Sequence, residues 1–255
     1  MEIYKRLLTN NDCYKAGRYI RPQGIVVHST ATPSVMGPRW CELWNKPGIK
    51  KCVHAFVDDT GVYQNLPWTM RGWHAGGTAN NTHIGFEICE PAGIVYENNK
   101  IVSYNIPDGY FEAIWNNAID LCVYLCKEYG LTEKDIIDHS EGNKLGIASN
   151  HGDVKHWWSL EFKTMDMFRE EVRKKLELID EEDDEMLSYE QFKEYMKRYE
   201  AERDALAGSD WSKVMRDWAN KEGLVNGDEK GNMRWKAPMT REEYVTVEYR
   251  QAHKN

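Results

Sequence analysis

Apolar residues follow two periods in the first two thirds of the chain. Short runs rich in β-branched and aromatic residues predict buried or half-buried strands at 25–27, 53–58, 61–66 and 84–89. The second and third of these runs flank Asp59-Thr60-Gly61, a turn that predicts a β-hairpin. Apolar positions at three- and four-residue spacing predict helices from Pro38 to Trp44, from Asp108 to Glu128 and from Phe162 to Ile179. We therefore expect an α/β fold with a mixed central β-sheet flanked by helices.

The pattern changes at the acidic run Asp180–Glu185, which predicts an exposed boundary. We expect a first domain at 1–179, an acidic linker and helix at 180–207, and a small helical C-terminal module at 208–255. In that module Thr240 and Glu243 match a helix capping box.

The predicted linker helix carries a narrow apolar stripe. Two alternatives stay open for this stripe: homo-oligomer formation through residues 189–206, or packing on its own domain. The stripe comprises Tyr189, Phe192, Met196, Tyr199 and Leu206.

Charge and hydropathy narrow the classes of partner. The 255 residues contain 33 Lys and Arg against 41 Asp and Glu, a net charge of -8, which argues against a nucleic-acid partner held by long-range attraction. No apolar run is long enough to span a bilayer, so we expect no membrane insertion. The N-terminal residues lack the features of a signal peptide, so we expect synthesis in the cytoplasm.

The six cysteines contain no CxxC pair, which argues against a zinc ribbon and against a disulfide framework. Cys122 and Cys126 lie four residues apart on a helical pattern and share one face, which favours core packing over metal binding. We expect most of the cysteines to be buried, reduced thiols.

Candidate chemistry is concentrated in the segment Asp138–Trp158. A strand-like lead-in at 135–138 delivers His139, and an eleven-residue connection that resembles a loop leads to His151, Asp153 and His156. Zinc hydrolases usually hold the metal through three protein groups from two or more segments and leave the fourth position for water. The best candidate outside this segment is His28, at the carboxyl end of the first strand, although a lone histidine there is more often structural.

Two further polar residues lie within predicted strands. Glu87 interrupts an apolar strand, and an unpaired buried carboxylate is costly, so this side chain reaches solvent, has a partner or serves in a site. His54 either lines a cleft or is a structural imidazole satisfied beside its strand.

Five segments taken together resemble one family. In order and spacing, they are similar to the zinc-dependent N-acetylmuramoyl-L-alanine amidases of the peptidoglycan-recognition-protein-like fold, and most of all to phage and prophage endolysins of Gram-positive hosts. The resemblance covers roughly residues 1 to 179. The segments are VVHST, VHAFVDDTGVYQNLP, WHAGG, IGFEICEP and DHSEGNKLGIASNHGDVKHWW.

The resemblance implies roles for individual residues. It matches the zinc (Zn²⁺) ligands of the family to His28, His139 and Asp153, and the conserved acid of the family, a general base, to Glu87. The second catalytic residue of the family, commonly lysine, falls on His151.

This departure leaves two questions open. His151 either stabilises the oxyanion as lysine would, or His151 or His156 replaces Asp153 as the third ligand. The tyrosine that some relatives carry beside the hairpin histidine is Val53 here, so its role is absent or belongs to Glu87.

The C-terminal segment WANKEGLVNGDEKGNMRWKAPMTREEY resembles a single S-layer-homology-type repeat. This second resemblance implies binding to other cell-wall polymers. Because such repeats usually act in sets of about three, a structural tail is the alternative.

The family resemblance implies a peptidoglycan hydrolase. It would cleave the amide between N-acetylmuramic acid and L-alanine of the stem peptide with zinc-activated water, and would act on the cell wall after release to lyse bacteria. One alternative is a non-catalytic peptidoglycan-binding protein of the same fold, and another is a zinc amidase for a different amide. The presence of all three ligand candidates favours an enzyme.

Overall fold

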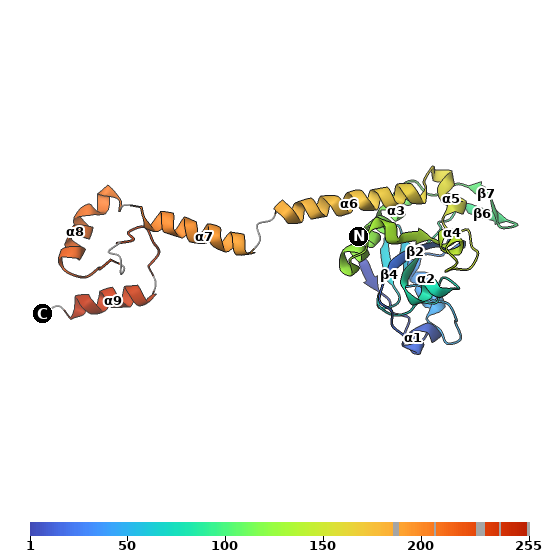
Figure 1. The fold of residues 1–255 in the computed structure, drawn as a ribbon, viewed down its shortest axis with the longest axis horizontal. Coiled ribbons are helices and arrows are strands. Elements are labelled where there is room, and N and C mark those ends of the chain that lie inside the picture. Colours follow the sequence, from blue (N-terminus) through green and yellow to red (C-terminus); the bar gives the residue numbers. More distant parts are fainter. Residues whose placement is uncertain (186–188, 207, 228–232, 240, 254–255) are drawn as a thin grey trace. The chain divides into compact units, whose positions relative to one another are not determined.

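A six-stranded sheet forms the centre of the N-terminal part of the chain (Figure 1). Its strand order is β1-β4-β3-β5-β2-β8, and β3 and β4 form its antiparallel pair while the other neighbours are parallel. The sheet is therefore mixed, as predicted. The strands are β1 (Ile3–Lys5), β2 (Gly24–Ser29), β3 (Ala55–Asp58), β4 (Gly61–Gln64), β5 (His83–Ile88) and β8 (Ile136–Asp138).

This computed structural model describes residues 1–185, 189–206, 208–227, 233–239 and 241–253. The chain divides into two compact units, Met1–Glu181 and Glu182–Asn255. The finer division at 179 and 207 stays a prediction. Every helix in the described residues is too short or too polar to span a lipid bilayer.

The pleat of the sheet separates its two faces. On β2, Ile25 and Val27 belong to the main apolar core, while Val26 and His28 alternate with them and point to the opposite face. All six residues of β2 are buried because β5 and β8 flank this strand on both sides. The face opposite the main core is therefore the one that carries His28.

Helix α3 (Tyr110–Tyr129) covers the main core face. It ends at Gly130, whose left-handed conformation (φ 65°) terminates the helix as the sequence predicts. Cys122 and Cys126 lie in its buried face, and all six cysteines are buried free thiols, which confirms the core-packing interpretation.

Helix α6 (Met165–Glu185) packs its first half on the same core through Met165, Phe168 and Val172. The prediction that this helix includes Phe162 is wrong. Phe162 follows a 3-10 turn at Ser159–Glu161 in the left-handed conformation (φ 55°), and its side chain is 88% exposed. The helix also continues through the acidic run to Glu185, because 165–185 contains no glycine or proline to stop it.

On the other side of the sheet, helix α2 (Gly37–Trp44) packs on Phe56 of β3, with the Trp40 ring stacked on the Phe56 ring and the Trp44 ring edge-on to it. This confirms the packing role that the sequence predicts for the two tryptophans. Strand β1, helix α1 (Asp12–Ala16) and a hairpin of β6 (Ile94–Glu97) and β7 (Lys100–Tyr104) were not predicted. The Asn98-Asn99 turn of the hairpin has positive φ at both residues, a conformation that asparagine tolerates well.

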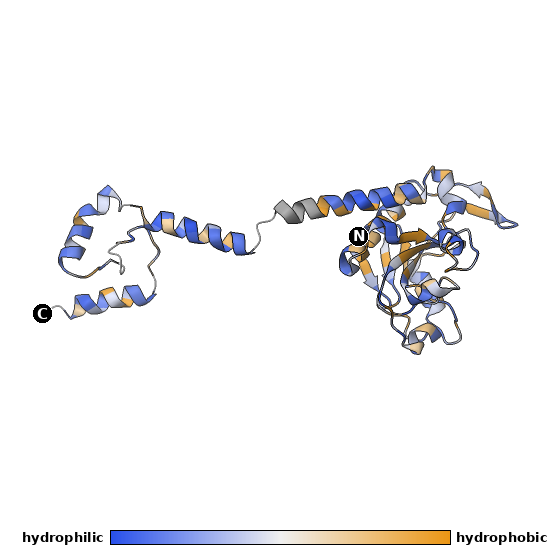
Figure 2. Cartoon of the chain, viewed as in Figure 1, coloured by the Kyte–Doolittle hydropathy of each residue, from blue (hydrophilic) through white to orange (hydrophobic). Residues whose placement is uncertain are grey.

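The second unit is helical in its described parts. It contains α7 (Tyr189–Asp204), α8 (Lys213–Lys221) and α9 (Arg241–Ala252). Trp211 lies in a 3-10 turn before α8 rather than within it, and Thr240, the predicted cap of α9, lies outside the described residues. Figure 2 shows apolar residues concentrated in the central sheet, whereas these helices are largely hydrophilic.

Candidate metal centre

Three of the predicted site residues converge at one edge of the sheet. The ligand atoms of His28, His139 and Asp153 all lie within 4.8 Å of one another. Asp153 Oδ2 is 3.1 Å from Nδ1 of His28 and 3.0 Å from Nδ1 of His139, and the two nitrogens are 3.0 Å apart. The structure therefore brings together the histidine-histidine-aspartate set that the sequence predicts.

Two adjacent parallel strands deliver the histidines. Strands β2 and β8 pair directly, so their carboxyl ends meet at the same edge. His139 is the first residue of α4 (His139–Lys144), which begins with a capping box between Asp138 and Glu141. The predicted eleven-residue loop after His139 is thus partly helical, because this cap starts a helix inside it.

A chain of hydrogen bonds selects the tautomer of His28. His74 Nε2 lies 3.2 Å from the carbonyl of His83, and since a carbonyl accepts, this nitrogen carries the proton. Burial lowers the pKa of His74 well below its usual range, and the nearby His28 lowers it further, so the ring is neutral and Nδ1 accepts. His28 Nε2, 2.9 Å away, donates to it. A neutral His28 thereby keeps the lone pair of Nδ1 for the cluster.

Ser149 orients His139 in the same way. The Ser149 hydroxyl donates to the carbonyl of Ala75 at 3.2 Å and accepts from His139 Nε2 at 3.1 Å. In a neutral His139 the lone pair of Nδ1 then faces Asp153. Neither His74 nor Ser149 was predicted as a site residue from the sequence.

The electrostatics favour a cation at this point. Burial opposes ionisation of Asp153, but its contacts with His139 and His28 outweigh burial and hold the pKa of the carboxyl well below its usual range. Burial lowers the pKa of His28 despite the nearby Asp153. The site therefore presents one carboxylate and two imidazole nitrogens to a cation.

This donor set fits zinc, which takes nitrogen and oxygen ligands. Zinc bonds of about 2.0–2.2 Å place neighbouring ligand atoms roughly 3.3 Å apart in a tetrahedral site. The observed separations of 3.0 to 3.1 Å are close to that spacing.

Glu87 lies on β5 directly opposite His28 in the parallel ladder. Its carboxylate lines a pocket of about 140 Å³ together with Lys51, Trp73 and His74, and one of its oxygens is buried without a hydrogen-bond partner in the described part of the chain. Burial raises the pKa of Glu87 well above its usual range; Asp153 raises it further, and Lys51 opposes the rise. Glu87 is therefore a proton-holding group beside the metal candidates.

The remaining predicted histidines lie in three different environments. His151 is exposed, and its ring lies 4.6 Å from the His139 ring with Nδ1 3.0 Å from Ser149 Oγ. His156 Nε2 instead contacts Glu90 at 2.8 Å. His54 is fully buried and bonds backbone groups of Met70 and Gly85 through its two nitrogens, which favours the structural interpretation of His54.

Comparison with known proteins places this site in a family. Residues 18–154 match the Amidase_2 family, described as N-acetylmuramoyl-L-alanine amidase. The matched region contains β2, β5 and β8 and all three ligand candidates.

Two curated relatives come from Bacillus subtilis strain 168. The N-acetylmuramoyl-L-alanine amidase CwlH is 32% identical over 145 residues, which are 54% of this chain and 52% of CwlH. The N-acetylmuramoyl-L-alanine amidase XlyA is 32% identical over 130 residues, 49% of this chain and 39% of XlyA. The chain thus spans about half or less of the length of these relatives.

Solved structures agree with the observed fold. The catalytic domain of XlyA superposes with a TM-score of 0.52 at 26% identity, over 68% of this chain and 99% of that domain. A mutant endolysin from Bacillus subtilis gives a TM-score of 0.53 at 25% identity, over 68% and 99% of the two chains. The predicted α/β fold class is confirmed.

Proposed function

Because this chain belongs to the Amidase_2 family of N-acetylmuramoyl-L-alanine amidases, we propose that it hydrolyses the amide between N-acetylmuramic acid and L-alanine of the peptidoglycan stem peptide. The observation that carries the proposal is the convergence of His28, His139 and Asp153 within 4.8 Å. Glu87 projects from the neighbouring strand on the same face of the sheet.

The three converging residues would hold zinc. A zinc ion there would polarise the amide carbonyl and lower the pKa of a water molecule to about 7. His74 and Ser149 keep the two imidazoles in the orientation and tautomer that this role needs.

Glu87 would transfer a proton from the attacking water to the departing nitrogen. An amide has a poor leaving group, so its hydrolysis needs a base for the attacking water and an acid for the departing nitrogen. A carboxyl whose pKa burial has raised is suited to take the proton of water and deliver it to the alanine nitrogen. The pocket that Glu87 lines gives the substrate access to this carboxyl.

His151 would stabilise the negative charge that develops on the carbonyl oxygen of the substrate. Its exposed ring at the edge of the cluster can donate to the oxyanion that forms on the carbonyl. Oxyanion contacts of this kind contribute about 3 to 4 kcal/mol to the stability of the transition state.

Mass spectrometry of the products tests the proposal. Purified peptidoglycan is treated with the zinc-loaded protein and, in parallel, with the protein and a chelator. Free stem peptides with an N-terminal alanine, released only with metal, are the expected result. Wall binding without product, despite stoichiometric zinc, would favour the non-catalytic alternative, and cleavage between sugars would contradict the family assignment.

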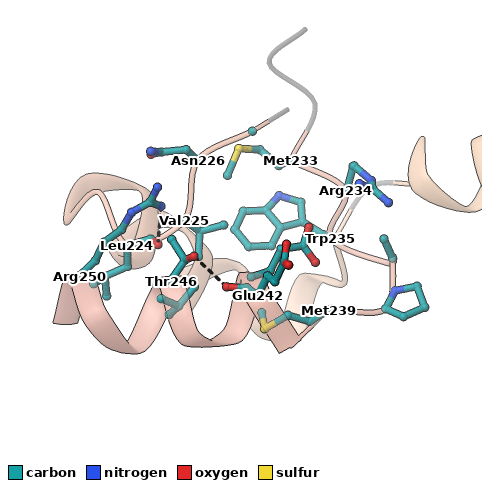
Figure 3. A pocket seen from close by; sticks show the side chains of 15 residues that line it. Leu224, Val225, Asn226, Met233, Arg234, Trp235, Met239, Glu242, Thr246 and Arg250 are labelled. Atoms are coloured by element: carbon teal, nitrogen blue, oxygen red, sulfur yellow. Dashed lines mark hydrogen bonds between the residues drawn. The ribbon is translucent and has the colours of Figure 1, made fainter. Parts of the chain in front are cut away.

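The second unit supplies a candidate wall-binding site. A cavity of about 570 Å³ is lined by Trp235, Arg234, Arg250 and Glu242, and Figure 3 shows the Trp235 ring at its centre. An aromatic face with charged groups around it suits a sugar polymer that carries polar substituents. Sedimentation of the full chain with cell walls, compared with a Trp235→Ala variant, tests this partner.

Lytic action on the cell wall after release is part of the same proposal, supported by the similarity to the Bacillus subtilis endolysin.

We also propose that the chain forms a homo-oligomer through residues 189–206. On α7, the side chains of Tyr189, Phe192, Tyr195 and Tyr199 are each at least 49% exposed. Analytical ultracentrifugation of the full chain and of a Phe192→Glu variant tests the oligomer, which the variant should dissociate.

A further inference from the structure

A second buried carboxylate lies behind the metal candidates. Glu90 follows β5 and is fully buried, with four hydrogen-bond donors around it. Its Oε1 is 2.6 Å from Ser29 Oγ, 3.1 Å from the backbone nitrogen of Ala31 and 2.8 Å from His156 Nε2, while Oε2 accepts from Tyr96 at 2.7 Å. Three donors on a single oxygen favour the charged form of the carboxyl, because hydrogen bonds to an ionised acceptor are stronger.

The charge of Glu90 is stable despite its burial. Burial alone would raise the pKa of Glu90, but the hydrogen bonds from His156, Ser29 and Tyr96 outweigh it and lower the pKa below the usual range. A fully satisfied buried network of this kind rigidifies the segments that it joins.

The network of Glu90 joins both sides of the metal centre. Ser29 directly follows the ligand candidate His28, whereas His156 belongs to α5 (Lys155–Trp158), which directly follows the turn that carries Asp153. A second connection runs in parallel, because Trp157 Nε1 donates to Ser29 Oγ at 3.0 Å. Glu90 thus connects the end of β2 to α5.

The turn between Asp153 and α5 needs such support. Val154 has φ 60° and ψ -40°, a positive-φ backbone conformation that is strained for a β-branched residue and costs of order 1–3 kcal/mol. Its side chain is fully buried in the main core. Strain of this kind persists where the surrounding contacts hold it, and here the backbone nitrogens of Trp157 and Trp158 in α5 donate to the carbonyl of Val154.

We propose that Glu90 is a positioning residue for the metal centre. Glu90 accepts hydrogen bonds from His156 and from Ser29, and Ser29 in turn accepts from Trp157. These contacts fix the position of α5, and α5 keeps Asp153 directed at the two histidine ligand candidates. The proposal rests on the proposed zinc function, and it assigns to Glu90 no contact with the metal or the substrate.

Glu90→Gln tests this role against a matched control. Asp58 is also a buried carboxylate, but its donors are Gly37 and Thr60, away from the cluster, so Asp58→Asn removes a comparable buried charge. We expect Glu90→Gln to weaken zinc affinity about 10–100-fold in a chelator competition, as is typical for groups that orient ligands. Asp58→Asn should lower the melting temperature but leave zinc affinity within twofold of the original protein.

A measurement without metal separates this inference from the proposed function. In the metal-free protein, amide hydrogen exchange of residues 153–158 should quicken in Glu90→Gln and stay unchanged in Asp58→Asn. If the original protein bound no zinc, the proposed function would fail, while this exchange result would still decide the role of Glu90. Unchanged exchange in Glu90→Gln would overturn the inference.

His156 provides a variant that is less prone to misfold, because its side chain is 25% exposed. His156→Ala removes the donor to Glu90, whereas the amide of His156→Gln reaches a similar position and restores it. We expect zinc affinity to fall in the first variant and to recover at least partly in the second. Equal loss in both would contradict positioning through Glu90, since glutamine can replace the hydrogen bond but is a poor zinc ligand.

Discussion

His28 and Glu87 are direct partners in the parallel ladder between β2 and β5. Side chains of paired residues leave the sheet on the same face, and adjacent strands lie about 4.8 Å apart. The sheet itself therefore sets the carboxyl beside the metal candidates. Because Glu87 belongs to a different strand from every proposed ligand, its chemistry can be removed without removing the metal.

Glu87→Gln should abolish amide cleavage and leave the zinc content intact. The glutamine side chain at position 87 cannot accept a proton from water. Loss of a general base typically lowers turnover about 10²- to 10⁴-fold. Turnover of a small muramyl peptide and metal content by mass spectrometry measure the two properties. Glu97→Gln, an exposed change on β6, is the control. Retained cleavage in Glu87→Gln would remove the base assignment.

The raised pKa of Glu87 predicts a pH-dependent stability difference in the metal-free protein. Its folded-state pKa lies above the ordinary glutamate value of 4.5, so ionisation is penalised in the folded state. The original protein therefore loses stability as pH rises from 4.5 through the folded-state pKa, by about 1.4 kcal/mol for each unit of difference. Glu87→Gln lacks this loss and should melt at a higher temperature at pH 8, with the difference vanishing near pH 4.

Thermal unfolding in the presence of a chelator, from pH 4 to pH 8, measures this effect. Equal melting temperatures of the two proteins at pH 8 would show that burial does not penalise the Glu87 carboxylate.

The position of His74, and through it the zinc affinity, should depend on Gly85, which packs against the His74 ring. A Cβ added at Gly85 would lie 2.3 Å from His74 Nδ1, the atom that accepts from His28. Gly85→Ala should displace His74, release the tautomer of His28 and weaken zinc affinity about 10–100-fold. Gly152→Ala, where the added Cβ meets open space, should leave affinity unchanged. Chelator competition measures both, and equal affinities would show that His74 does not orient the ligand.

Much of this arrangement was predictable from the sequence. The β-branched run at 25–27 and the apolar run around Glu87 predicted strands β2 and β5, and the family resemblance assigned His28, His139 and Asp153, which the fold brings together. These positions could be predicted because strand periodicity and short motifs are local properties of the sequence.

Other features depend on contacts between distant segments. His74 lies in the segment WHAGG, and its role follows from its position over Gly85. Glu90 lies just after β5, and its donors come from segments up to 66 residues away. By contrast, the Asp138–Glu141 capping box was visible in the sequence, and its use would have predicted α4.

His151 stands where the family commonly has lysine, and this difference makes a direct test. We expect His151→Ala to lower turnover on the order of 10²- to 10³-fold, because the oxyanion loses a donor, while zinc affinity stays unchanged. His151→Lys should retain much more activity than His151→Ala, since an ammonium can make the same contact. His253→Ala, at an exposed histidine of the second unit, is the control. If zinc affinity fell with turnover in His151→Ala, His151 would be a ligand, and Asp153 would lose its assignment as the third one.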